Sequence, residues 1–214
     1  MKSVAIVLYP GLTPLDVAGP YHVISQFPGY EITFVSEKKG PISDGKKFEL
    51  SAESALSDVT FVDMLVVPGG LPAIKMARSG GPYIEWIRAI HPLTEWTLSI
   101  CTGALMLGAA GVLQGMKATT HWYSHHELSH YGAQPIDARF VRDGKIMTSA
   151  GVSAGIDMSL ALASEIFGET FAQSMQLDME YDPAPPFNAG HPRSAPAEVT
   201  AGLRDIFDSV VKKL

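Results

Sequence analysis

The chain has very little cysteine: Cys101 is the only one among 214 residues. An intrachain disulfide is therefore excluded, and the composition fits a reducing compartment, so the cytoplasm is the expected location. No apolar stretch is long enough to span a bilayer. The apolar run at the start is short and ends at Pro10 and Gly11, as a strand entering a turn does.

A cluster of basic residues is also missing, and the formal charge is −6, so nucleic acid is not an expected partner. Phosphate-binding patterns of the G-x-x-x-x-G-K and G-x-G-x-x-G types are absent, which leaves a nucleotide role without support. The apolar content of 46% and charged content of 18% are typical of a well-packed α/β protein. We expect one domain over residues 1–214.

Strand and helix patterns alternate along the chain, which predicts a mostly parallel sheet covered by helices on both faces. Strand patterns, including two hairpins, occupy residues 3–8, 30–36, 40–50, 61–67, 94–100, 117–120 and 140–148. Helix patterns occupy residues 82–90, 102–110, 124–130, 153–167, 169–179 and 198–212, and another begins at Pro14. Gly19 and Pro20 are expected to kink or end that first helix. The proline-rich residues 181–196 are expected to be irregular.

Three of the expected strands end in unusual residues, at 9–16, 68–71 and 101–103. Ligands of such sheets bind beyond the carboxyl ends of the strands. We therefore expect these three turns to lie together and to form the functional site.

Cys101 stands at the junction of an apparent strand and an apparent helix. The position is similar to a nucleophile elbow, where a sharp strand-to-helix turn exposes the attacking atom. The helix N-terminus would favour the thiolate form. The alternative is a buried structural cysteine, since free cysteines are often buried.

Asp16 is the candidate acidic partner of this thiol. The spacing from Thr13 favours a capping box, in which Asp16 has a structural role. If Asp16 instead faces the cysteine, burial and like charge raise its pKa, and it can act as a general acid.

Gly69, Gly70 and Thr102 are candidates for charge stabilisation. The glycine N–H groups could bind a developing negative charge, or the pair could simply form a tight turn. The Thr102 N–H is a second possible donor, and its hydroxyl could orient a water molecule. The alternative is an ordinary residue of the first helical turn.

Four histidines, at positions 121, 125, 126 and 130, have i,i+4 spacings that could suit a metal. We expect no metal, because His125 and His126 fall in the first turn of a helix capped by Ser124 and Glu127, and no closing ligand follows. His121 alone remains a candidate for substrate binding, since it follows the expected strand 117–120.

Several segments together resemble the ThiJ/PfpI superfamily, in the right order and over nearly the whole chain. They are residues 15–20 (LDVAGP), 66–70 (VVPGG), 100–104 (ICTGA), 118–122 (ATTHW) and 149–157 (SAGVSAGID). The tail 177–187 (LDMEYDPAPPF) is similar to the isonitrile hydratase subgroup. The resemblance implies a flavodoxin-like fold related to class I glutamine amidotransferase domains.

The resemblance further implies that Cys101 is the nucleophile, that Asp16 is its acidic partner, and that the protein is a homodimer without metal or organic cofactor. Protease-like members carry histidine where this chain has Thr102, so a Cys-His protease mechanism is not expected. Many members carry glutamate where this chain has Asp16. Sensor domains of transcription regulators share the motifs, but we expect no DNA-binding part here.

The predicted function is a lyase that hydrates an isonitrile, R–N≡C, to an N-substituted formamide. Cys101 would attack the terminal carbon while Asp16 delivers a proton, and water would then release the product from a thioimidate. Three alternatives remain. They are another cysteine chemistry such as glyoxal hydration or amide hydrolysis, a redox sensor, and a ligand-binding module.

Overall fold

The computed structural model describes residues 1–212 and contains a seven-stranded sheet. Its strands are β1 (Lys2–Val7), β2 (Tyr30–Ser36), β5 (Ser54–Ala55), β6 (Met64–Val67), β7 (Trp96–Ile100), β10 (Phe140–Asp143) and β11 (Ile146–Ser149). They lie in the order β10-β11-β7-β6-β1-β2-β5, and only the β10–β11 pair is antiparallel. The sheet is therefore mostly parallel, as predicted.

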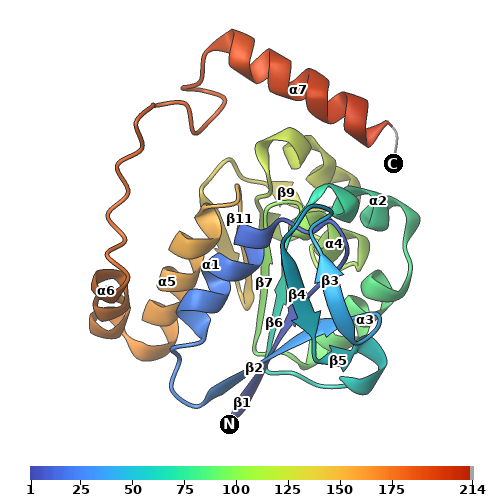
Figure 1. Cartoon of the computed structure of the whole chain (residues 1–214), viewed down its shortest axis with the longest axis vertical. Helices are drawn as coiled ribbons and strands as arrows, with labels where there is room; N and C mark the ends of the chain where they lie inside the picture. Colours follow the sequence, from blue (N-terminus) through green and yellow to red (C-terminus); the bar gives the residue numbers. More distant parts are fainter. Residues whose placement is uncertain (213–214) are drawn as a thin grey trace.

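Helices cover both faces of this sheet (Figure 1). One side carries α1 (Pro14–Ile24), α5 (Ala154–Phe167) and α6 (Glu169–Asp178), and the other carries α2 (Leu71–Ser79), α3 (Pro82–Ile90) and α4 (Gly103–Ala109). The three-layer α/β arrangement confirms the predicted flavodoxin-like fold class.

The core lies along the central strands. All of β6 and the last four residues of β1 are buried, and these buried stretches are runs of apolar residues without polar alternation. Such runs are expected of parallel strands that are covered on both faces. The central strands end at the same edge of the sheet, so the turns that follow β1, β6 and β7 are neighbours.

Smaller elements complete the chain. The predicted hairpin over 40–50 is present as β3 (Gly40–Ser43) and β4 (Glu49–Ala52), and β10 and β11 form the second predicted hairpin. The strand predicted over 117–120 is only β8 (Lys117–Ala118), paired with β9 (Gln134–Pro135). Short 3₁₀ segments are η1 (Leu56–Asp58) and η2 (His91–Leu93).

Two helices differ from the sequence prediction. Helix α2 was not predicted, although Pro72 near its start and the apolar spacing of Ala73, Ile74 and Ala77 are helix signals. Helix α1 continues through Pro20 to Ile24. Pro20 is buried against α5, where a Cβ built on Gly155 would lie 3.3 Å from its Cγ, and this packing offsets the missing N–H.

The predicted α-helix over 124–130 is instead a longer 3₁₀ segment, η3 (Trp122–Tyr131). Its N-cap is His121, and the predicted capping box is wrong. The buried Ser124 hydroxyl has no hydrogen-bond partner within residues 1–212, whereas the Glu127 carboxylate pairs with Arg78 at 3.1 Å.

The chain then leaves the layered body. Residues 181–196 contain no helix or strand, as predicted, and lead to α7 (Ala197–Val211). Helix α7 lies across the carboxyl-end side of the sheet and contacts α2 (Figure 1). Within residues 1–212, no helix is both long and apolar enough to cross a membrane.

Candidate active site

Cys101 occupies the sharp turn between β7 and α4, with a left-handed φ of 55°. This conformation is unfavourable for a residue with a side chain, and two hydrogen bonds hold it. The Cys101 N–H donates to Ser149 O at 3.1 Å, and the Thr120 hydroxyl donates to Cys101 O at 2.7 Å. The turn also requires Gly103, because a Cβ there would lie 2.2 Å from Val67 O. The nucleophile elbow is therefore confirmed.

Asp16 lies in the first turn of α1 and is completely buried. Its Oδ2 accepts a hydrogen bond from the Gly69 N–H at 2.9 Å, while its Oδ1 has no partner within residues 1–212. Thr13 is the N-cap residue but makes no side-chain capping bond. The capping-box interpretation of Asp16 is therefore wrong, and the carboxyl group turns toward β6 and the cysteine.

Burial controls the protonation of both groups. It raises the pKa of Asp16 to about 7, although the Gly69 N–H opposes the shift. Burial also raises the pKa of the Cys101 thiol well above its usual value, and the nearby Asp16 charge adds to this; the Thr102 N–H opposes it. Burial raises the Asp16 pKa as predicted, but the predicted repulsion from the cysteine is wrong, because a hydrogen bond with Cys101 lowers this pKa. The predicted resting thiolate is wrong, because desolvation of the sulfur outweighs the helix N-terminus.

The two glycines have partners in the protein. The Gly69 N–H binds Asp16, and the Gly70 N–H donates to the Thr102 hydroxyl at 2.9 Å. Their predicted donation to a substrate anion is therefore not supported. Gly69 is required here for space, since a Cβ would lie 2.8 Å from Asp16 Oδ2 and 2.6 Å from Thr102 N.

The Thr102 hydroxyl donates its single proton to Gly70 O at 2.8 Å. It is therefore not free to donate to a water molecule, and the hydroxyl ties the turn after β7 to the turn after β6. The backbone N–H of Thr102 is the group that remains directed at the cysteine sulfur, where it lowers the pKa of the thiol.

A cavity of about 140 Å³ adjoins the thiol and explains how a buried cysteine, 6% exposed, is reached. It is lined by Thr13, Gly70, Leu71, Ile74, Cys101, Thr102, His121, Tyr123, Val152 and Phe207. No carboxylate, lysine or arginine is among these residues. Four of them (Ile74, Tyr123, Val152 and Phe207) lie outside the turns and residues predicted for the site, because apolar wall residues have no sequence pattern that distinguishes them from core residues.

His121 reaches this cavity as predicted, from the residue before η3. Burial lowers the pKa of His121 to about 4, so its ring is neutral. Its Nδ1 accepts from the Tyr123 N–H at 3.4 Å, which places the ring proton on Nε2. Among residues 1–212, no group of three or more histidine, cysteine, aspartate or glutamate side chains could hold a metal ion.

The structure is therefore an α/β protein with a cysteine at a sharp strand-to-helix turn, beside a buried carboxyl group whose pKa is raised. Residues 2–165 match the DJ-1/PfpI family. The chain belongs to this family, and the resemblance predicted from the sequence is confirmed.

Three relatives illustrate the range of the family. An isonitrile hydratase of Pseudomonas putida is 38% identical over 94% of this chain and 88% of its own length. A deglycase of Pyrococcus furiosus is 29% identical over 63% of this chain and 81% of its own. The crystal structure of a ThiJ/PfpI family protein from Pseudomonas syringae superposes with a TM-score of 0.90 at 34% identity, covering 99% of this chain and 88% of that one.

Proposed function

We propose that the protein is an isonitrile hydratase that converts R–N≡C to an N-substituted formamide. The observation that carries the proposal is the Cys101–Asp16 pair, two buried acids beside an uncharged cavity. An isonitrile is neutral, and its terminal carbon accepts both a nucleophile and a proton. The 38% identical hydratase of Pseudomonas putida supports the same choice.

The first step requires that Cys101 and Asp16 together hold one proton. With Asp16 ionised and Cys101 a thiol, the carboxylate takes the thiol proton as the sulfur attacks the isonitrile carbon. The same carboxyl group then gives that proton to the carbon, through the oxygen that has no other partner within residues 1–212. The S–C and C–H bonds form together, and the product is the thioimidate Cys–S–CH=N–R.

The second step consumes water. A water molecule adds to the thioimidate carbon while Asp16 accepts one of its protons and passes it to the nitrogen, giving Cys–S–CH(OH)–NH–R. Asp16 then takes the hydroxyl proton as the C=O bond forms and the C–S bond breaks. It gives that proton to the sulfur, and the formamide R–NH–CHO leaves. A positioned acid/base of this kind contributes about 10²–10⁴-fold to the rate.

Two alternatives fit the geometry less well. Amide or glyoxal chemistry develops an oxyanion, which needs free N–H donors, but the Gly69 and Gly70 N–H groups have protein partners. A redox sensor needs an exposed thiolate, but Cys101 is buried and the pKa of its thiol is raised.

The test is intact-mass analysis of the protein after incubation with phenyl isonitrile, together with detection of N-phenylformamide. We expect an adduct of substrate mass on Cys101 and its loss as formamide appears. Cys101→Ala is the control and should give neither. Turnover by that variant would contradict the mechanism, and consumption of methylglyoxal without consumption of isonitriles would favour the glyoxalase alternative.

We also propose that the protein is one domain, works as a cytoplasmic homodimer and binds no nucleic acid. The exposed side chains of Leu177 (80%) and Phe187 (77%) support self-association, since large apolar side chains are otherwise covered. The molar mass by light scattering checks the dimer.

A further inference from the structure

Helix α7 is peripheral, yet one of its side chains reaches the site. None of its residues is buried, but Phe207 lines the cavity that contains Cys101. The Phe207 ring centroid lies 5.0 Å from that of Tyr123 and 5.7 Å from that of His121. Phe207 therefore brings α7, which lies on the carboxyl-end side of the sheet (Figure 1), into the wall of the cavity.

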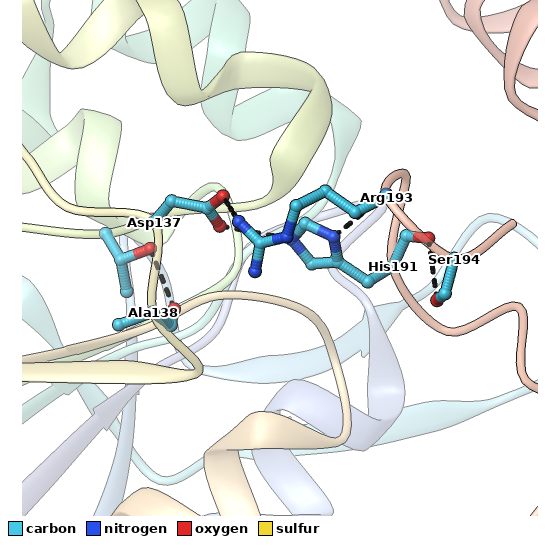
Figure 2. A network of polar contacts seen from close by, with 6 residues as sticks. Asp137, Ala138, His191, Arg193 and Ser194 are labelled. Carbon is cyan, nitrogen blue, oxygen red and sulfur yellow. Dashed lines mark hydrogen bonds and ion pairs between the residues drawn. The ribbon is translucent and has the colours of Figure 1, made fainter.

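Two sets of contacts fix the position of α7. Beside Phe207, the Tyr123 hydroxyl donates to Asp208 Oδ1 at 2.7 Å. Before the helix starts, Asp137 pairs with His191 at 3.1 Å and with Arg193 (Figure 2). The helix is thus held at both ends, and Phe207 has a defined place over the cavity.

The remaining apolar walls belong to the body of the protein. Ile74 is 1% exposed and Tyr123 8% exposed, and Leu71 begins α2. Changing these residues would disturb the packing of the layers. Phe207 is only partly buried and belongs to a helix with no buried residue, so it can change without loss of the fold.

The volume of about 140 Å³ limits what the cavity can hold. An engineered cavity of roughly 150 Å³ in another protein binds benzene. A ligand with one six-membered ring therefore fits beside Cys101, whereas a fused two-ring ligand exceeds this volume. The uncharged lining provides no partner for a charged substituent.

We propose that Phe207 is a specificity-determining residue that limits the substrate to neutral isonitriles whose substituent is about the size of one aromatic ring. The inference rests on the proposed function for the identity of the reacting group. It goes further by assigning the size limit to one side chain of the C-terminal helix.

The test compares kcat/KM for phenyl isonitrile and for 2-naphthyl isonitrile. We expect the wild-type protein to prefer the phenyl compound and Phe207→Ala to raise the naphthyl-to-phenyl ratio at least tenfold, because one extra methylene in an apolar pocket already changes discrimination by about 10–200-fold. Ile206→Ala is the matched control, since Ile206 is on the same helix, 57% exposed and outside the cavity.

A second measurement separates this inference from the proposed function. Cys101 is the only cysteine, so its alkylation rates by N-ethylmaleimide and by N-pyrenylmaleimide report access without any turnover. Phe207→Ala should raise the pyrenyl-to-ethyl ratio, and Ile206→Ala should not. An unchanged maleimide ratio in folded Phe207→Ala overturns the inference. A changed ratio in a protein that hydrates no isonitrile preserves the size limit and rejects the hydratase.

Discussion

The turns at the carboxyl ends of the strands and the C-terminal segment are held in place by opposite means. Around Cys101 and Asp16, nearly every polar group is buried and hydrogen-bonded to a neighbouring turn. The segment from 181 to α7 has no buried residue and is attached by ion pairs and aromatic contacts at the surface.

This difference in attachment matches two structural requirements, one for the reacting groups and one for the wall of the cavity. The reacting groups need fixed geometry and a low local dielectric to share a proton, and only the core supplies both. The outer wall of the cavity needs only shape, which a loosely attached helix can supply. Under the two proposals, the chemistry depends on the core, and the size of the substrate depends on a part that can change without disturbing the core.

The strongest test of the core is Asp16→Asn, which keeps an acceptor for the Gly69 N–H but holds no titratable proton. We expect activity to fall by about 10²–10⁴-fold, the usual contribution of a general acid/base. Stability should instead rise at neutral and alkaline pH, since the variant has no buried carboxylate to desolvate.

The direction of this stability change follows from the pKa values of Asp16 in the folded and unfolded states. Its folded-state pKa of about 7 lies above the unfolded value of 3.8, so wild-type stability falls as pH rises between them and is constant above 7. The advantage of Asp16→Asn should grow over that range to at most about 4 kcal/mol. Urea unfolding at pH 4 and pH 8.5 measures it, with the surface variant Asp137→Asn as control. If the Asp16→Asn variant is less stable than wild type at pH 8.5, the carboxylate is not desolvated.

A smaller effect on kcat/KM is expected from a change of pH alone. In the proposed mechanism the singly protonated Cys101–Asp16 pair is the reactive form, and it is reached when the first proton leaves at about pH 7. The value of kcat/KM should therefore rise about tenfold per pH unit below 7 and level off above it. Initial rates between pH 5 and 9 test this, and a rate that declines above pH 7 would mean that the doubly protonated pair reacts.

The smallest effect is expected on the unfolding free energy when the contacts that attach the C-terminal segment are removed. Asp137, His191 and Arg193 are all substantially exposed, with side-chain exposures of 51%, 39% and 69%. Exposed pairs contribute about 0–1 kcal/mol, so Asp137→Ala should leave the unfolding free energy within about 1 kcal/mol of wild type. Urea unfolding measures it. A larger loss would show that the segment folds cooperatively with the core, and the proposed separation of the two regions would fail.

The sequence predicted the elements whose signals are local. Continuous apolar runs identified the central strands, and the junction before Cys101 identified the elbow. Local signals were misleading where a distant partner competes. The spacing from Thr13 favoured a cap for Asp16, but the Gly69 N–H, more than fifty positions away, binds the carboxyl group instead. Ser124 and Glu127 fit a capping box, but Glu127 pairs with Arg78 of α2.

The predictions for the site residues also succeeded where the signal is local and failed where a distant partner competes. Cys101 and Asp16 were predicted, and so were Gly69, Gly70 and Thr102 as members of the site. The glycine N–H groups and the Thr102 hydroxyl turned out to bind other site residues. Phe207 carries no signal in the sequence, because it reaches the cavity only after residues 181–196 bring α7 back over the sheet.

The sequence by itself determined that this chain forms a mostly parallel α/β sheet with a thiol at the carboxyl edge. The signals were the order of apolar runs and turns and the one cysteine at a strand end, and such patterns act between residues close in sequence. The tertiary structure alone decided that the sulfur rests protonated, that Asp16 shares its surroundings, and that a helix from the far end of the chain closes the cavity. Desolvation and cavity shape depend on everything that packs around an atom, and no local pattern records that.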